Sequence, residues 1–119
     1  MAIHTALPIY KAAYDLLDLS TDLVKNMRRD LKHVFGGKIT EECIEILVLI
    51  GRANAARDKG KLLLDLLERL QVAEFLIRLA CDKKLISTKQ YARSVELTTS
   101  IGKQANGWRG KQSTQAPAA

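Results

Sequence analysis

The sequence predicts an all-α protein, an antiparallel up-down-up-down four-helix bundle, from three observations. Apolar residues make up 47% of its 119 residues but aromatic residues only 5%, so the core must consist of aliphatic side chains, which suits packed helices better than a sheet. The two prolines, Pro8 and Pro117, lie near the ends and leave room for long helices between them. Short connections between four helical segments make neighbouring helices antiparallel.

The first predicted helix begins near Thr5 or Leu7 and ends at the Gly36-Gly37 pair. Pro8 falls in its first turn, where the missing N–H group costs nothing. Apolar residues recur along this helix at spacings of three and four, namely Leu16, Leu19, Leu23, Met27 and Leu31. This spacing places them on one face.

The second predicted helix begins at Thr40 and extends to about Arg57. The hydroxyl group of Thr40 can accept hydrogen bonds from free N–H groups of the first turn. Glu41 and Glu42 follow it, where the positive end of the helix dipole favours acidic residues. A turn ending at Gly60 then leads into the third helix.

The third predicted helix covers residues 62–82 and is followed by a Lys83-Lys84 corner. The fourth is expected to start at Ser87, because Ser87 and Gln90 have the spacing of a capping box, in which each residue caps the other's backbone N–H group. Beyond Gly107 no apolar periodicity continues. We therefore expect one bundle domain over residues 1–109 and a flexible tail over 110–119.

The third helix carries more apolar surface than one bundle core needs. At 100° per residue, one stripe faces the core and consists of Leu62, Leu66, Leu70, Ala73, Ile77 and Ala80. A second stripe on this helix, together with the all-round apolar run of the second helix, predicts an interface between subunits, formed by Ile46, Val48, Val72, Phe75, Leu76 and Leu79. The alternative is that the first and fourth helices cover this surface.

Catalytic and metal-binding patterns are weak throughout the sequence. His4 and His33 have no partner at the spacing of a helical metal site, and the acidic pairs fall on solvated helix faces. Cys43 and Cys81 are too few for a disulfide framework, and no signal-like segment opens the chain, so a cytoplasmic protein is expected. The longest apolar run, Ile46–Ile50, is far shorter than the roughly 20 residues that cross a membrane. Neither an enzyme nor a cofactor is expected.

The charge is strongly positive, at +6, with 19 lysines and arginines against 13 acidic residues. Lys25, Arg28, Arg29 and Lys32 fall at i, i+3, i+4 and i+7, which places four cations on one side of the end of the first predicted helix. In an up-down bundle, this helix end and the corner between the third and fourth helices share one end of the molecule. The basic residues expected there, as contacts for nucleic-acid phosphates, are Lys25, Arg28, Arg29, Lys32, Arg78, Lys83, Lys84, Lys89 and Arg93. Cations that complement the carbonyl end of a helix are the alternative explanation.

Several segments of the sequence resemble the Avd-like four-helix bundle proteins. These segments are Leu7–Lys11, Arg52–Asn54, Ala56–Lys59, Leu70–Glu74, Lys89–Ala92 and Gly102–Trp108. Proteins of this kind are accessory variability determinants of diversity-generating retroelements, and they are related to bundle proteins encoded in ribosomal RNA intervening sequences. The resemblance covers essentially the whole chain except its C-terminal end.

This resemblance implies a homopentamer of four-helix bundles that binds RNA or DNA and associates with a reverse transcriptase. In such a system the polymerase copies a template RNA into mutated cDNA, and the accessory protein has no catalytic activity of its own. A structural protein interaction module without nucleic-acid function, of the intervening-sequence type, is the alternative. The resemblance assigns no single residue to a site.

Overall fold

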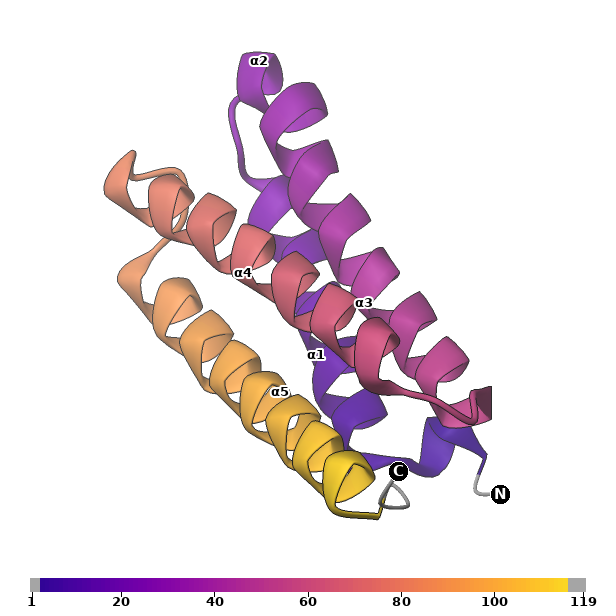
Figure 1. The fold of residues 1–119 in the computed structure, drawn as a ribbon. Coiled ribbons are helices and arrows are strands. Elements are labelled where there is room, and N and C mark those ends of the chain that lie inside the picture. The colour runs from indigo at the N-terminus through magenta and orange to yellow at the C-terminus, as the bar shows by residue number, and fades with distance from the viewer. Residues whose placement is uncertain (1–2, 116–119) are drawn as a thin grey trace.

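Four long helical rods form the structure, a computed structural model that describes residues 3–115 (Figure 1). Its elements are a short 3₁₀ turn η1 (His4–Ala6), α1 (Pro8–Lys25), α2 (Arg29–Leu31), a π-helical turn η2 (Lys32–Gly36), α3 (Gly37–Ala55), α4 (Gly60–Asp82) and α5 (Thr88–Gln115). The backbone stays helical from α2 through η2 into α3. These three elements therefore make one rod.

The four rods pack in a closed cycle. α1 contacts α3 and α5, and α4 also contacts α3 and α5. Successive rods run in opposite directions, and short connections join them (Figure 1). The predicted all-α, antiparallel four-helix bundle is confirmed.

The first connection lies earlier in the chain than the sequence predicts. α1 ends at Lys25, and Arg28 has an extended backbone, with φ −58° and ψ 146°, which breaks the helix. Met27 is buried and anchors this turn to the core. Gly36 and Gly37 are not a stop signal, because both are helical. Thr40, the predicted start of the second helix, consequently lies inside α3.

Close packing explains why a glycine stands in the middle of this rod. A Cβ atom added at Gly36 would lie 2.7 Å from Cγ1 of Val24 on α1, whereas one added at Gly37 would meet nothing within 4 Å. Gly36 is the last residue of the π-helical turn, and the N–H group of Gly37 donates to the carbonyl of Lys32, five residues earlier. Glycine at position 36 therefore permits α1 and the π-helical turn to approach each other.

The start of α5 follows the prediction closely. The N–H group of Ser87 donates to Oε1 of Gln90 at 2.9 Å, and the N–H group of Gln90 donates to Oγ of Ser87 at 3.0 Å. This is the predicted capping box. At the other end, α5 continues through Gln115, so residues 110–115 of the expected tail are helical, and 116–119 lie outside the described residues.

The core stripe of α4 agrees with the prediction except at its first position. Leu66, Leu70, Ala73, Ile77 and Ala80 are all buried. Leu63 is buried at the start of the helix, and Leu62, predicted there, is only half-buried. The small shift keeps the stripe facing the other three rods.

Lys59 connects α3 and α5 at the end of the bundle opposite the α4–α5 turn. Nζ of Lys59 donates to the carbonyls of Ala53 at 2.8 Å and Ala56 at 2.5 Å, which are at the end of α3. The same ammonium group lies 5.8 Å from the ring centroid of Trp108 on α5. Lys59 therefore links the last carbonyls of α3 to the aromatic side chain of α5.

Candidate nucleic-acid interface

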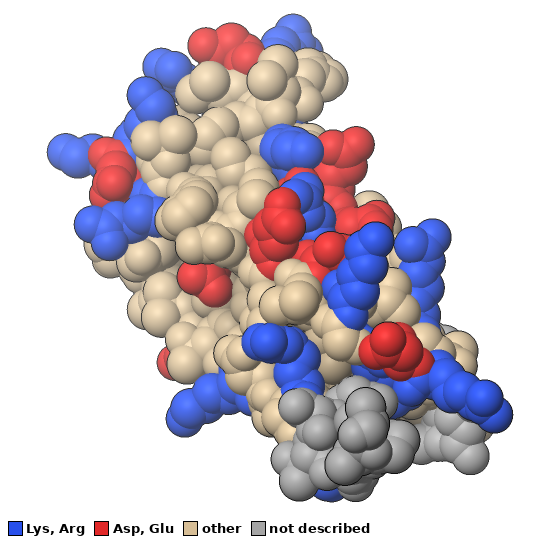
Figure 2. Space-filling view, in the orientation of Figure 1, with Lys and Arg blue, Asp and Glu red and all other residues tan. Residues whose placement is uncertain are grey.

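Two basic turns meet at one end of the bundle. One is the connection from α1 to α2, which contains Arg28, and the other is the connection from α4 to α5, which contains Lys83 and Lys84 (Figure 1). A groove of about 460 Å³ lies between them, and we call it the turn groove. Its lining residues are Asn26, Arg28, Leu31, Lys83, Lys84 and Leu85. In the space-filling view, basic side chains gather around the α4–α5 turn, with acidic side chain atoms between them (Figure 2).

The α4–α5 turn holds its lysines in a defined backbone conformation. The N–H group of Lys84 donates to the carbonyl of Cys81, and that of Leu85 donates to the carbonyl of Ala80, both at 2.9 Å. This pair of bonds is a Schellman motif, which normally has glycine at the position of Lys84, because that residue must adopt positive φ. Lys84 has φ 60°. A lysine therefore occupies a position that favours glycine.

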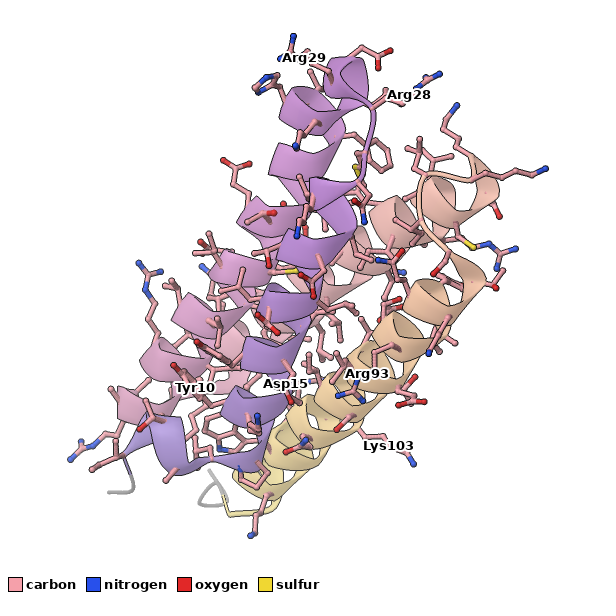
Figure 3. The ribbon with its side chains drawn as sticks, turned by 180° about the vertical axis from the view of Figure 1, so that it is seen from behind. Tyr10, Asp15, Arg28, Arg29, Arg93 and Lys103 are labelled. Atoms are coloured by element: carbon pink, nitrogen blue, oxygen red, sulfur yellow. The ribbon has the colours of Figure 1, made fainter. Side chains whose placement is uncertain are left out.

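The first connection separates basic residues that the sequence placed on one helix face. Lys25 ends α1, Arg28 lies in the turn, and Arg29 and Lys32 belong to the next rod. Arg28 extends toward the α4–α5 side, whereas Arg29 points away from it (Figure 3). The prediction of four cations on one helix face is therefore wrong, although these residues share one end of the molecule.

Two predicted contacts are engaged by acidic residues. Nε of Arg78 lies 3.2 Å from Oδ1 of Asp82, and its guanidinium group lies 5.9 Å from the ring centroid of Tyr91. Nη1 of Arg93 lies 3.1 Å from Oε2 of Glu96. These arginines are partly neutralised, so their charges attract an anion less strongly than those of the exposed lysines of the turn.

Arg93 also lies away from the basic end. It extends from α5 toward the Asp15 side of α1, well below Arg28 in the view of Figure 3. Asp15 raises the pKa of Lys11 through a hydrogen bond of 2.8 Å, and the charge of Arg93 opposes that rise. Arg93 is therefore close to Lys11 on the side of the bundle, and its predicted place in the cationic cluster is wrong.

The cations lining the turn groove remain largely available. Nε of Arg28 lies 3.6 Å from Oδ1 of Asp30, but both side chains are mostly exposed. An ion pair between exposed side chains is weak, so it leaves the arginine largely free to bind an anion. Lys83 and Lys84 are exposed. Lys25, Arg29 and Lys89 are exposed at the same end, and Lys32 is half-buried there. The structure thus brings Arg28, Lys83 and Lys84 to one groove, and further basic residues lie at the same end of the bundle.

A second charged groove, of about 560 Å³, lies between α3 and α4, and no pattern in the sequence predicts it. One of its lining residues is Glu42, whose side chain is only 4% exposed. Nζ of Lys38 lies 3.0 Å from Oε1 of Glu42, and Nη1 of Arg69 lies 3.2 Å from the same oxygen. No local pattern could pair Glu42 with Arg69, because 27 residues separate them.

The residues predicted to form a subunit interface differ in how far they are exposed on the single chain. Phe75 and Leu79 on α4 are 65% and 43% exposed, and Val48 on α3 is exposed as well. Val72 and Leu76 are half-buried. Ile46 has no exposed surface, so its prediction as an interface residue is wrong. Its side chain belongs to the core.

Reactive and metal-binding groups are sparse in the described part of the chain. Over residues 3–115, no three histidine, cysteine, aspartate or glutamate residues are grouped so that they could hold a metal ion. Burial raises the pKa of the Cys43 thiol to about 12, so it stays protonated at neutral pH and is a poor nucleophile. Among these residues no helix has the length and apolarity that crossing a bilayer requires.

Comparison with known proteins identifies the family of this chain. A sequence model described as bAvd-like matches residues 7–112, which include all four rods and both basic turns. No curated protein and no solved structure matches the chain. The match covers most of the chain, and the structure has the expected four-helix fold. The chain belongs to the bAvd-like family.

Proposed function

We propose that this bAvd-like protein is a non-catalytic accessory subunit of a diversity-generating retroelement. In this role it binds template RNA or the cDNA copied from it and associates with the reverse transcriptase. Membership of the family supports the retroelement role. The observation that carries the nucleic-acid function is the turn groove, where Arg28, Lys83 and Lys84 line one concave surface.

Electrostatics favours a polyanion at this end of the bundle. The groove lining contains three cations and no acidic residue. Lysines and arginines that contact phosphates release condensed counterions, so binding at such a site weakens as the salt concentration rises. The net charge of +6 adds a long-range attraction for nucleic acid.

Charge reversal in the turn groove should weaken RNA binding. We expect the triple variant Arg28→Glu, Lys83→Glu, Lys84→Glu to lose at least about tenfold in affinity for RNA at low salt, and to lower the salt slope of log K by about 2. Fluorescence anisotropy of a labelled RNA, titrated over a range of salt concentrations, measures both quantities.

A charge-matched triple distinguishes the groove from net charge. Lys61→Glu, Lys103→Glu and Lys111→Glu reverse the same number of exposed positive charges outside the groove. An equal loss of binding in both triples would show that total charge, not the groove, governs affinity. Unchanged binding in the groove triple would contradict the placement and would favour a protein interaction module.

The role also includes self-assembly, for which the exposed apolar residues of α4 are the proposed contacts. Phe75→Glu should lower the molar mass measured by light scattering, because it places a charge on the most exposed part of this surface. Tyr14→Glu, at a residue on α1 with 52% exposure, is the control. A wild-type chain with the mass of a monomer would contradict the interface.

A further inference from the structure

We propose that the turn groove selects single-stranded nucleic acid over duplex by accepting one nucleotide at a time. This inference rests on the proposed nucleic-acid function and specifies the form of the ligand. The cations hold the phosphate, and the base lies against the apolar part of the groove. Asn26 is placed to contact the edge of that base.

The size and concave shape of the groove support this ligand. Its volume of about 460 Å³ lies within the range of pockets that enclose small molecules. A duplex keeps its bases stacked inside, so a pocket of this size can meet only its backbone. A single strand can turn a base outward into the pocket while its phosphate stays on the rim.

The lining has the chemistry that a whole nucleotide requires. Leu31 and Leu85 are half-buried and come from the two sides of the groove. Asn26 carries amide donors and an acceptor that can bond to a base edge. The planar guanidinium group of Arg28 can either pair with phosphate or stack on a base. The two leucines give the groove an apolar surface against which a base can pack, and Leu85 also packs against the bundle core.

The backbone of Lys84 provides an independent observation. A lysine with φ 60° is strained, and the surrounding Schellman bonds would be equally well made by glycine. An unusual backbone at a charged residue that lines a groove is typical of a position kept for function. Lys84→Gly should therefore remove the cation and leave the turn intact.

The Lys84→Gly substitution tests RNA binding without an expected loss of stability. The full-length protein is titrated with a short unstructured RNA strand and with the duplex formed from that strand and its complement. We expect the wild-type protein to bind the single strand about tenfold more tightly than the duplex. Lys84→Gly should weaken single-strand binding several-fold, weaken duplex binding less because a duplex reaches only the rim of the groove, and keep or raise the thermal midpoint of unfolding.

A control variant outside the groove tests whether the preference for single strands depends on the position of the charge. Lys103→Ala, on the α5 surface outside the groove, removes the same charge and should leave the preference for single strands unchanged. Equal wild-type affinity for the two forms, or equal weakening of both by Lys84→Gly, would overturn this inference but not the proposed function. Binding of neither form would overturn both. If Lys84→Gly unfolds the protein, Lys83→Ala must show the selective loss instead.

Discussion

Replacing Arg69 with methionine should lower the free energy of unfolding by about 3 kcal/mol. The guanidinium group of Arg69 is one of two cationic partners of the carboxylate of Glu42, which is buried between α3 and α4. Removing one partner leaves a buried negative charge incompletely compensated, and that cost exceeds the value of an exposed ion pair. Methionine keeps much of the length and the apolar stem of the side chain.

The geometry explains why this effect should be large. Nη1 of Arg69 lies 3.2 Å and 3.3 Å from the two oxygens of Glu42, whose side chain is only 4% exposed. Lys38, the other partner, is four residues earlier on the same helix and cannot link α3 to α4. The arginine therefore both compensates the buried charge and connects two rods.

A matched arginine provides the control for this prediction. Arg93→Met breaks the exposed pair with Glu96 at 3.1 Å and should cost no more than about 0.5 kcal/mol. Urea denaturation followed by circular dichroism measures both variants. The double variant Glu42→Leu, Arg69→Met removes the charge together with its partner, so it should recover part of the loss. Equal destabilisation by Arg69→Met and Arg93→Met would contradict the role of burial.

Local signals in the sequence predict much of the fold. The leucine stripe of α4 and the capping box at Ser87 each depend on residues only a few positions apart, and both are present in the structure. The first connection was missed because its cause is not local. Glycine usually weakens a helix, but at position 36 it permits contact with Val24, twelve residues earlier on another rod.

The same distinction applies to the candidate interface. Topology alone predicts that the Lys83-Lys84 corner and the end of α1 share one end of the bundle, and the groove between the two turns agrees with it. The position of Arg93 beside Lys11 and the pairing of Glu42 with Arg69 depend on how two helices rotate against each other. Apolar periodicity predicts which face of a helix is buried to within about one residue position. That precision is too low to predict which single side chains form an ion pair.

Substitution of the two adjacent glycines by alanine should have effects of opposite sign. Gly36→Ala should destabilise the protein by about 2 kcal/mol, because it overpacks the contact between η2 and α1. Gly37→Ala should stabilise it by up to about 1 kcal/mol, because alanine favours the helix and a Cβ at that position meets nothing within 4 Å. Thermal and urea unfolding of the two variants measure the difference.

Val24 determines the size of the first effect. A Cβ at position 36 would lie 2.7 Å, 3.0 Å and 3.3 Å from Cγ1, Cγ2 and Cβ of Val24. Rotation of the valine side chain cannot move its own Cβ, so the backbone of α1 or of the π-helical turn must shift. Truncation by Val24→Ala removes the two nearest atoms, Cγ1 and Cγ2, and leaves only the 3.3 Å contact with Cβ. It should restore most of the stability lost in Gly36→Ala, giving a coupling energy of about 1 kcal/mol or more in a double-mutant cycle. Additive effects of the two substitutions would contradict the contact.

This contact also connects the fold to the proposed site. Val24 lies two residues before Asn26, where the lining of the turn groove begins. A shift of α1 at Val24 moves the turn that carries Arg28 relative to the α4–α5 turn, so Gly36→Ala should weaken binding of single-stranded RNA. Gly37→Ala should leave that binding unchanged. If Gly36→Ala lowers stability and leaves binding intact, the groove does not depend on the spacing of its two turns, and its lysines alone hold the strand.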